Sequence, residues 1–113
     1  DLLLSQFDDP GNTSIGLLAA TPAALFVGFN NNAVVVLFKT TAAAPAVRAD
    51  FSGTAGCMAG GASCRGLGGD GLGAPAVNRQ LFDSRALRFG TTDWLYLVTG
   101  DGTNAVQVWR IPG

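Results

Sequence analysis

Apolar positions in this chain fall in short runs with a period of two, and turn-forming residues separate the runs. A period of two puts successive side chains on opposite faces, as in a β-strand, whereas an amphipathic helix repeats every 3.6 residues or so. The runs are also rich in β-branched and aromatic residues, which fit the surface of a sheet. The pattern predicts strands over Leu2–Phe7, Ser14–Ala20, Ala24–Asn30, Val34–Thr40, Val47–Ser52, Ser84–Phe89, Trp94–Thr99 and Ala105–Ile111.

The segments between these runs carry the residues that tight turns require. Asn30-Asn31-Asn32 and Gly100–Asn104 join neighbouring runs, and Asn and Asp-Gly tips tolerate a positive φ and close hairpins. The Ala-rich stretch Thr41–Ala46 is the one candidate helix, but it is short and contains Pro45, which argues against a helix. The sequence therefore predicts one all-β domain over residues 1–113.

Residues 53–78 differ from the rest because they hold most of the chain's glycine and no strand pattern. A connection of this length predicts a surface loop that is functional or mobile. Cys57 and Cys64 lie in it, separated by six residues that are mostly Gly and Ala. Such a loop has little core of its own to hold it, which favours a disulfide between the two cysteines. Two free thiols are the alternative.

The two halves of the chain resemble each other, which indicates an internal repeat. The shared pattern is a strand, a turn, a Leu-aromatic strand, a Gly/Asn hairpin and a strand that ends aromatic-basic. Short strands repeated in this way indicate radial repetition of small sheets. The matches at a spacing of 70 are Ser14/Ser84, Leu17/Leu87, Thr21/Thr91, Leu25/Leu95 and Phe26/Tyr96, and at a spacing of 71 Val35–Lys39 meets Val106–Arg110.

Two segments carry a resemblance to a known architecture. Leu25-Phe26-Val27-Gly28, followed by an Asn-rich turn, and Val106-Gln107-Val108-Trp109-Arg110 resemble the blades of bacterial secreted β-propellers. Those blades read Leu-Tyr-Val-Gly, a Gly/Asn turn and then Val-Trp-Arg. The chain lacks the Trp-Asp ending of WD blades, so the resemblance names the propeller architecture and no subfamily.

The resemblance implies two four-stranded antiparallel blades. The first blade spans 14–52, the Gly-rich disulfide loop spans 53–78, and the second blade combines 84–111 with 1–7. Two blades leave bare sheet edges and cannot close a ring. The expected partners are therefore further copies of this chain or the remainder of a larger propeller. A simple β-sandwich is the alternative fold.

Composition narrows the partner classes. Apolar residues make up 48% of the chain and charged residues 13%, which is enough apolar surface to offset the entropy of ordering. The net charge is −1, so neither nucleic acid nor an anionic membrane surface is expected as a partner. No apolar run approaches the roughly 18 residues of a membrane-spanning helix.

The chain contains no histidine and no glutamate, since all eight acidic residues are Asp. Histidine is the commonest general base and metal ligand. Ser-His-Asp, Cys-His and His-zinc chemistry are therefore excluded, and we expect a non-catalytic protein with no cofactor and no bound metal. The low lysine content and the expected disulfide suit an extracellular or periplasmic protein.

Aromatic and polar residues of the second half form the candidate binding set. Aromatic rings stack on sugar rings, and polar groups beside them supply directed hydrogen bonds. This set predicts a secreted binding module with glycans as its candidate ligands. Aromatics on strands also pack between blades, so a structural or assembly subunit, or a fragment of a larger extracellular propeller protein, is the alternative. The candidate residues are Trp94, Tyr96, Asp101, Trp109 and Arg110.

Leu2–Phe7 is expected to pair beside Ala105–Ile111, either of its own chain or of a neighbouring one, because the first half has four predicted strands and the second has three. Three leucines left in solvent would each forgo burial of about 1.5–3 kcal/mol. Deleting residues 1–7 should therefore abolish the soluble assembly, as measured by native mass and melting temperature. A truncated chain that keeps both would contradict the propeller closure and favour the sandwich.

Overall fold

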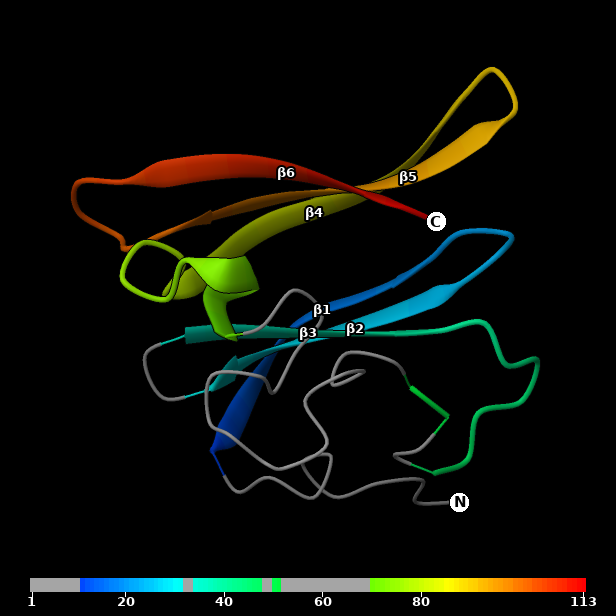
Figure 1. Ribbon diagram of the computed structural model, residues 1–113, viewed down its shortest axis with the longest axis horizontal. Helices are drawn as coiled ribbons and strands as arrows, with labels where there is room; N and C mark the ends of the chain where they lie inside the picture. Colours follow the sequence, from blue (N-terminus) through cyan, green and yellow to red (C-terminus); the bar gives the residue numbers. More distant parts are fainter. Residues whose placement is uncertain (1–10, 32–33, 48–49, 52–69) are drawn as a thin grey trace.

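The computed structural model describes residues 11–31, 34–47, 50–51 and 70–113. The predicted strand Leu2–Phe7 and the Cys57/Cys64 pair lie outside these residues. Six strands and one short 3-10 turn form within the described part of the chain (Figure 1). They are β1 (Asn12–Ala20), β2 (Leu25–Asn31), β3 (Val34–Thr40), η4 (Asp70–Gly73), β4 (Gln80–Phe89), β5 (Thr92–Gly100) and β6 (Val106–Pro112).

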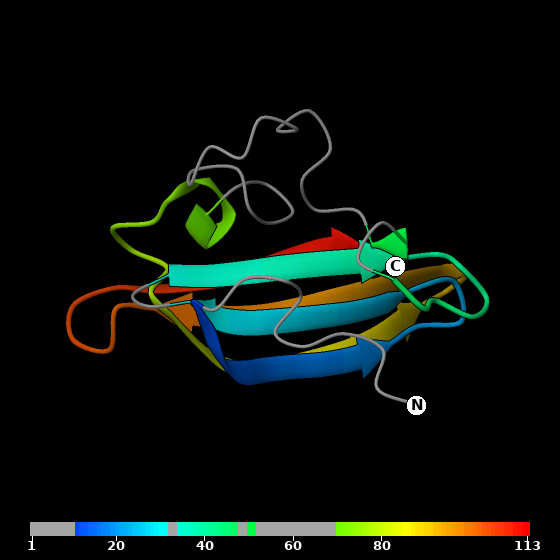
Figure 2. The same cartoon turned by 90° about the horizontal axis from the view of Figure 1, so that it is seen from below.

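The six strands form two antiparallel sheets, each in chain order. The first sheet is β1-β2-β3 and the second is β4-β5-β6. Figure 1 shows the sheets as two stacked layers, and Figure 2 shows the strands of both layers running in nearly the same direction. The fold is therefore all-β, as the alternating pattern predicts, and the two sheets do not close into a barrel or ring within the described residues.

The expectation of four strands in each sheet is wrong for the described residues, where each sheet has three. The predicted strand Val47–Ser52 is replaced by a turn at its described positions. The carboxylate of Asp50 accepts the N–H groups of Ala46 at 2.7 Å and Val47 at 3.0 Å, and the Asp50 N–H donates to Val47 O at 3.0 Å. These backbone groups are satisfied locally and are not offered to β3, because Asp caps turns readily.

Apolar side chains from facing strands fill the space between the sheets. Phe26 and Leu37 from the first sheet are fully buried against Leu95 and Leu97 from the second. Trp109 packs at the side of this cluster. Burial of this kind is the main favourable contribution to folding, at about 25 cal/mol for each Å² of apolar surface.

The first sheet is buried on its other face as well. Val27, Phe29, Val36 and Phe38 form a second cluster with Phe51, and the rings of Phe29 and Phe38 meet edge to face at 6.1 Å. A strand covered on both faces reads as a continuous apolar run instead of an alternating one. This explains why β3 begins with five consecutive apolar residues.

The second and third strands of the two halves occupy equivalent positions in their sheets. Phe26 pairs with Lys39, and its repeat partner Tyr96 pairs with Arg110. The first strands do not match in the same way: Leu17 pairs with Gly28, whereas Leu87 pairs with Trp94. The β4–β5 hairpin turns on two residues and the β1–β2 turn on four, so the ladders of the first strands are displaced along the sheet.

Equivalent residues face opposite ways relative to the shared core. Phe26 and Leu37 point into the core, whereas their equivalents Tyr96 and Val108 lie on the face of the second sheet that points away from the first. We call this the front face of each sheet. The opposite, back faces carry Val27 and Phe38 in the first sheet, and Leu97 and Trp109 in the second. The sheets thus pack front to back.

Asn78 is fully buried, and all four of its polar groups form hydrogen bonds. Two of these bonds reach the two sheets, and the other two reach the turn at η4. Its carbonyl accepts the N–H of Val35 at 3.0 Å, and its own N–H donates to Ala74 O at 2.9 Å. Its side-chain amide donates to Gly71 O at 2.9 Å and accepts the hydroxyl of Thr99 at 2.7 Å. One residue therefore fixes the edge of β3, the η4 turn and the middle of the second sheet in relation to one another.

Replacing Asn78 with Ala should lower the free energy of unfolding by about 1–3 kcal/mol for each buried partner left unsatisfied, here Gly71 O and Thr99 Oγ1. Chemical denaturation measures the loss. The matched control is Asn104→Ala, because Asn104 is exposed in a turn and its substitution should change stability by less than about 0.5 kcal/mol. Equal losses in the two variants would contradict the role given to Asn78.

Candidate binding surface on the second sheet

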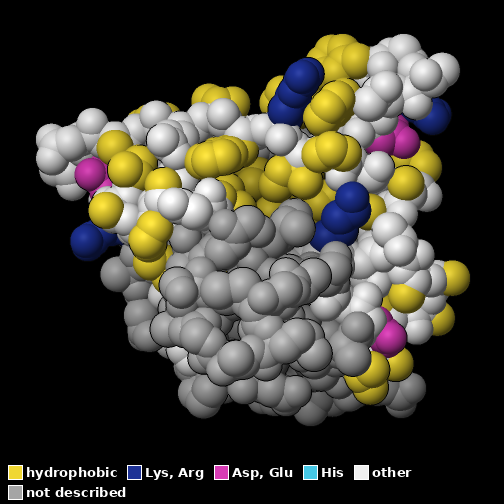
Figure 3. Space-filling view, viewed as in Figure 1, with side chains coloured by type: hydrophobic (Ala, Val, Ile, Leu, Met, Phe, Trp, Pro, Cys, Tyr) yellow, Lys and Arg dark blue, Asp and Glu magenta, His cyan; other side chains and the backbone are white. Residues whose placement is uncertain are grey.

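The front face of the second sheet is an exposed surface built from alternate residues of three strands. Cross-strand pairing places Leu87 beside Trp94, and Val98 beside Val108. Figure 3 views the two layers from the side and shows hydrophobic and basic side chains on the upper part of the molecule, where β4, β5 and β6 lie. The exposed fractions on this face include Leu87 42%, Phe89 59%, Val106 70% and Val108 70%.

Aromatic contacts give this face a defined shape. The guanidinium of Arg110 lies over the ring of Trp94, 4.2 Å from its centroid. Such cation–π contacts contribute about 0.5–1 kcal/mol at exposed sites. The rings of Phe89 and Tyr96 meet edge to face at 6.1 Å. The ring of Trp94 is therefore covered by the Arg110 cation, and the ring of Tyr96 packs against that of Phe89.

Charged residues cross the middle of the face. Tyr96 pairs with Arg85 on one side and with Arg110 on the other, so it is flanked by two arginines. Arg85 Nη1 lies 3.2 Å from the carboxylate of Asp83, and both side chains are more than half exposed. Exposed apolar side chains together with aromatic and Arg residues are a composition that protein interfaces favour.

The structure brings together three of the five predicted site residues: Trp94, Tyr96 and Arg110 lie on the front face of the second sheet. Trp109 lies on the back face, where its Nε1 donates to the hydroxyl of Thr99 at 3.1 Å and its ring packs against the core. The separation follows from the period of two, which puts Trp109 and Arg110 on opposite faces.

Asp101, the fifth predicted site residue, lies in the β5–β6 turn. Its carboxylate accepts three backbone N–H groups, from Thr103 and Asn104 at 2.8 Å and from Ala105 at 3.1 Å. These hydrogen bonds, that from Thr103 first, lower the pKa of Asp101 below its ordinary value. The geometry gives Asp101 a turn-forming role at the end of the sheet.

Sequence reasoning did not include the aliphatic part of the surface. Leu87, Phe89, Val106 and Val108 stand in runs that predict strands, and an apolar residue on a strand is expected to be buried. In β6, Val106 and Val108 alternate with Trp109 and Ile111. This alternation was a usable signal, because it puts apolar residues on both faces of the strand. That pattern indicates a sheet covered on both faces, and here one of the two is exposed.

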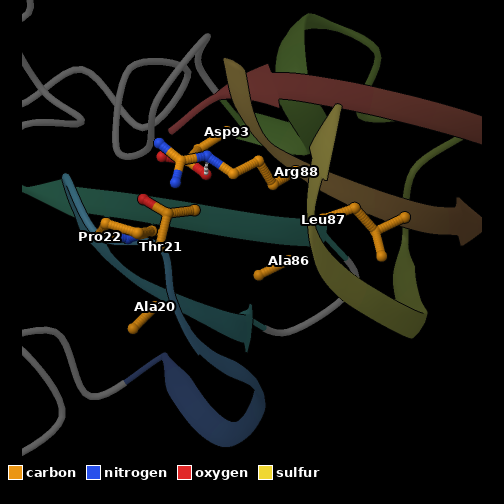
Figure 4. A pocket seen from close by; sticks show the side chains of 7 residues that line it. All are labelled: Ala20, Thr21, Pro22, Ala86, Leu87, Arg88 and Asp93. Carbon is orange, nitrogen blue, oxygen red and sulfur yellow. Dashed lines mark ion pairs between the residues drawn. The ribbon is translucent and has the colours of Figure 1, made fainter. Parts of the chain in front are cut away.

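Two hollows adjoin the second sheet. One, of about 170 Å³, lies between the β1–β2 turn and the β4–β5 hairpin, where Figure 4 shows Arg88 and Asp93 together. Their Nε and Oδ1 atoms are 3.3 Å apart, so the charges neutralise each other. The other hollow, of about 440 Å³, lies beside the β5–β6 turn between Phe82 and Val106 and extends the front face of the second sheet.

In the described part of the chain, no three Asp side chains come close enough to bind one metal ion. Within residues 11–31, 34–47, 50–51 and 70–113, no helix has the length and apolarity of a membrane span.

Comparison with known proteins adds no relative. The sequence matches no protein-family model, and searches of the curated proteins and of the solved structures find no similar chain.

The lowered pKa of Asp101 leads to a prediction about pH. A carboxyl group whose folded pKa is depressed contributes stability above its unfolded pKa, and this is lost as the pH falls through the folded pKa. Asp101→Asn keeps a side-chain oxygen but removes the charge. We expect the variant to be less stable than the wild type at neutral pH, with the difference shrinking in acid, as followed by thermal unfolding. A difference that does not change with pH would contradict this role of the charge.

Proposed function

We propose that this chain is a non-catalytic protein-docking module, a pair of propeller-blade-like sheets that belongs to a larger β assembly. The front face of the second sheet is its interface. The observation that carries the proposal is the exposure of large apolar side chains on that face, where Phe89, Val106 and Val108 are each more than half exposed. Large exposed apolar patches with a polar border mark interaction sites.

Front-to-back packing supports the propeller-like part of the proposal. In a sandwich whose halves face each other, equivalent residues of two repeated sheets would both point into the shared core. Here Leu37 is in the core and its equivalent Val108 is 70% exposed. Radial repetition produces this arrangement, because each sheet offers its front face to the back face of the next.

The contacts favour a protein ligand over a glycan at the same face. A sugar ring stacks on an open aromatic face, but Arg110 already covers Trp94. Leu87, Val106 and Val108 are also exposed on this face, and aliphatic side chains supply no hydrogen bonds to sugar hydroxyls. Trp and Arg are, in contrast, the residues that contribute most to protein interfaces. Carbohydrate binding at Trp94, Tyr96 and Arg110 is the second form of the proposal.

The expected compartment is extracellular or periplasmic. This part of the proposal rests on the spacing of Cys57 and Cys64, two cysteines in a Gly-rich loop, and on the low lysine content. Small domains in oxidising compartments use such disulfides to close loops that lack a core.

Val108→Lys tests the interface. An isolated chain with an exposed apolar face should self-associate as its concentration rises, and a lysine at this exposed position on β6 should weaken the association at least about tenfold, or about 1.4 kcal/mol. Sedimentation velocity over a concentration series measures the effect. The control is Val47→Lys, because Val47 is 53% exposed and lies outside both sheets.

Two results would contradict the docking proposal. One is a wild-type chain that stays monomeric and binds an apolar dye no better than Val108→Lys. The other is a glycan array on which the wild type binds and Trp94→Ala does not, while Val108→Lys binds like the wild type. That second result would establish the carbohydrate form in its place.

A further inference from the structure

We infer that the front face of the second sheet binds the back face of a third sheet of the same repeat, stacked as the second sheet is stacked on the first. This inference rests on the proposed docking function and names its partner. The partner is inferred from the contact between the first and second sheets, where a front face of this repeat is already bound by a back face.

The contact between the two sheets serves as the template. The front face of the first sheet presents Phe26 and Leu37, which are fully buried against Leu95 and Leu97 on the back face of the second. Tyr96 and Val108 stand at the equivalent positions of the second sheet and project outward. The chain therefore displays the same kind of surface twice and covers it once.

The polar contacts across the first interface also have equivalents on the front face of the second sheet. Lys39 lies over the ring of Phe26 at 5.5 Å, and its Nζ donates to the carbonyl of Pro112, at the end of β6, at 2.8 Å. Arg110 stands where Lys39 does in the repeat, and it also lies over an aromatic ring, although that ring belongs to Trp94 and not to Tyr96, the equivalent of Phe26. Its guanidinium is placed to donate to a carbonyl at the end of a third sheet.

A second equivalence concerns the edge of the sheet. The N–H of Val35 on β3 donates to the carbonyl of Asn78, in the segment that leads into the second sheet. Val106 on β6 is the equivalent of Val35. A third sheet entering through a similar segment would offer a carbonyl to the edge of β6 in the same way.

The partner surface can be described in more detail from one difference between the two front faces. The first has Gly28, and a Cβ built there would lie 3.1 Å from Leu81 on the neighbouring sheet. The second has Val98 at the equivalent position, so the third sheet needs a smaller residue where Leu81 stands. Its back face needs apolar residues at the positions of Leu97 and Trp109.

The back face of this chain's own first sheet does not meet that need. Val36 is fully buried there, and Phe38 is 3% exposed. A second copy would have to uncover them before it could stack in the same sense. The inferred occupant is therefore a further sheet with an open back face, and two copies that meet front to front are the alternative outcome.

The test supplies the third sheet. In a tandem chain, residues 1–111 are followed directly by a second copy of residues 41–111. The junction is placed after Ile111 because Ile111 is the equivalent of Thr40 at the spacing of 71. The added copy carries Leu81→Ala. The first copy carries Val108→Cys, and maleimide labelling at position 108 is followed by peptide mass. We expect labelling at least about tenfold slower than in the single chain with the same substitution, because docking must open first.

Two variants of the added copy provide matched controls. Leu95→Asp with Leu97→Asp places charges on its back face and should restore fast labelling. Tyr96→Asp with Val108→Asp places the same charges on its front face and should leave labelling slow. If both variants protect position 108, or if neither does, the inference is wrong.

The outcome also separates this inference from the proposed function. Fast labelling in the tandem chain, combined with association of the wild type that Val108→Lys abolishes, would overturn the third sheet and leave the docking face. Fast labelling combined with a wild type that neither associates nor binds the apolar dye would overturn both.

Discussion

The relation between the two sheets depends on Asn78, a buried polar residue in the connection that leads from one to the other. A buried amide is tolerated only where its polar groups are paired, and Asn78 pairs with β3, with the η4 turn and with Thr99 on β5. Thr99 in turn accepts the indole N–H of Trp109. Two three-stranded sheets that could slide on an apolar interface are thereby held in one alignment.

The alignment determines which surface is left open. Because the sheets pack front to back, the apolar front of the first sheet is covered and that of the second is exposed. Apolar side chains left in water forgo the stabilisation that burial would give. The exposed face carries Val106 and Val108 at 70% exposure, and this exposure is the basis of the docking proposal. The cation–π pair of Trp94 and Arg110 shapes this face without making it polar.

Much of the fold could be predicted from local chemistry. Six strands follow the runs that predict them, and the repeat of Leu25–Lys39 and Leu95–Arg110 reappears in the pairing of Phe26 with Lys39 and Tyr96 with Arg110. The fourth strand of the first sheet could not be excluded in advance, because Val47–Ser52 has strand-like composition. Its replacement by a turn follows from the carboxylate of Asp50, which satisfies the backbone of Ala46 and Val47. Composition does not reveal whether these backbone N–H groups bond to a nearby side chain or to a neighbouring strand.

The sequence by itself determined the all-β class, the strand positions and the absence of histidine chemistry, since these depend on neighbours in the chain and on residue types. Tertiary structure alone decided which face of each strand is covered. It put Trp109 against the core and Trp94 on the surface, and it gave Asp101 to a turn. Alternation assigns residues to two faces but is symmetric between them. Only the packing of one sheet on another makes one face inner and leaves the other exposed.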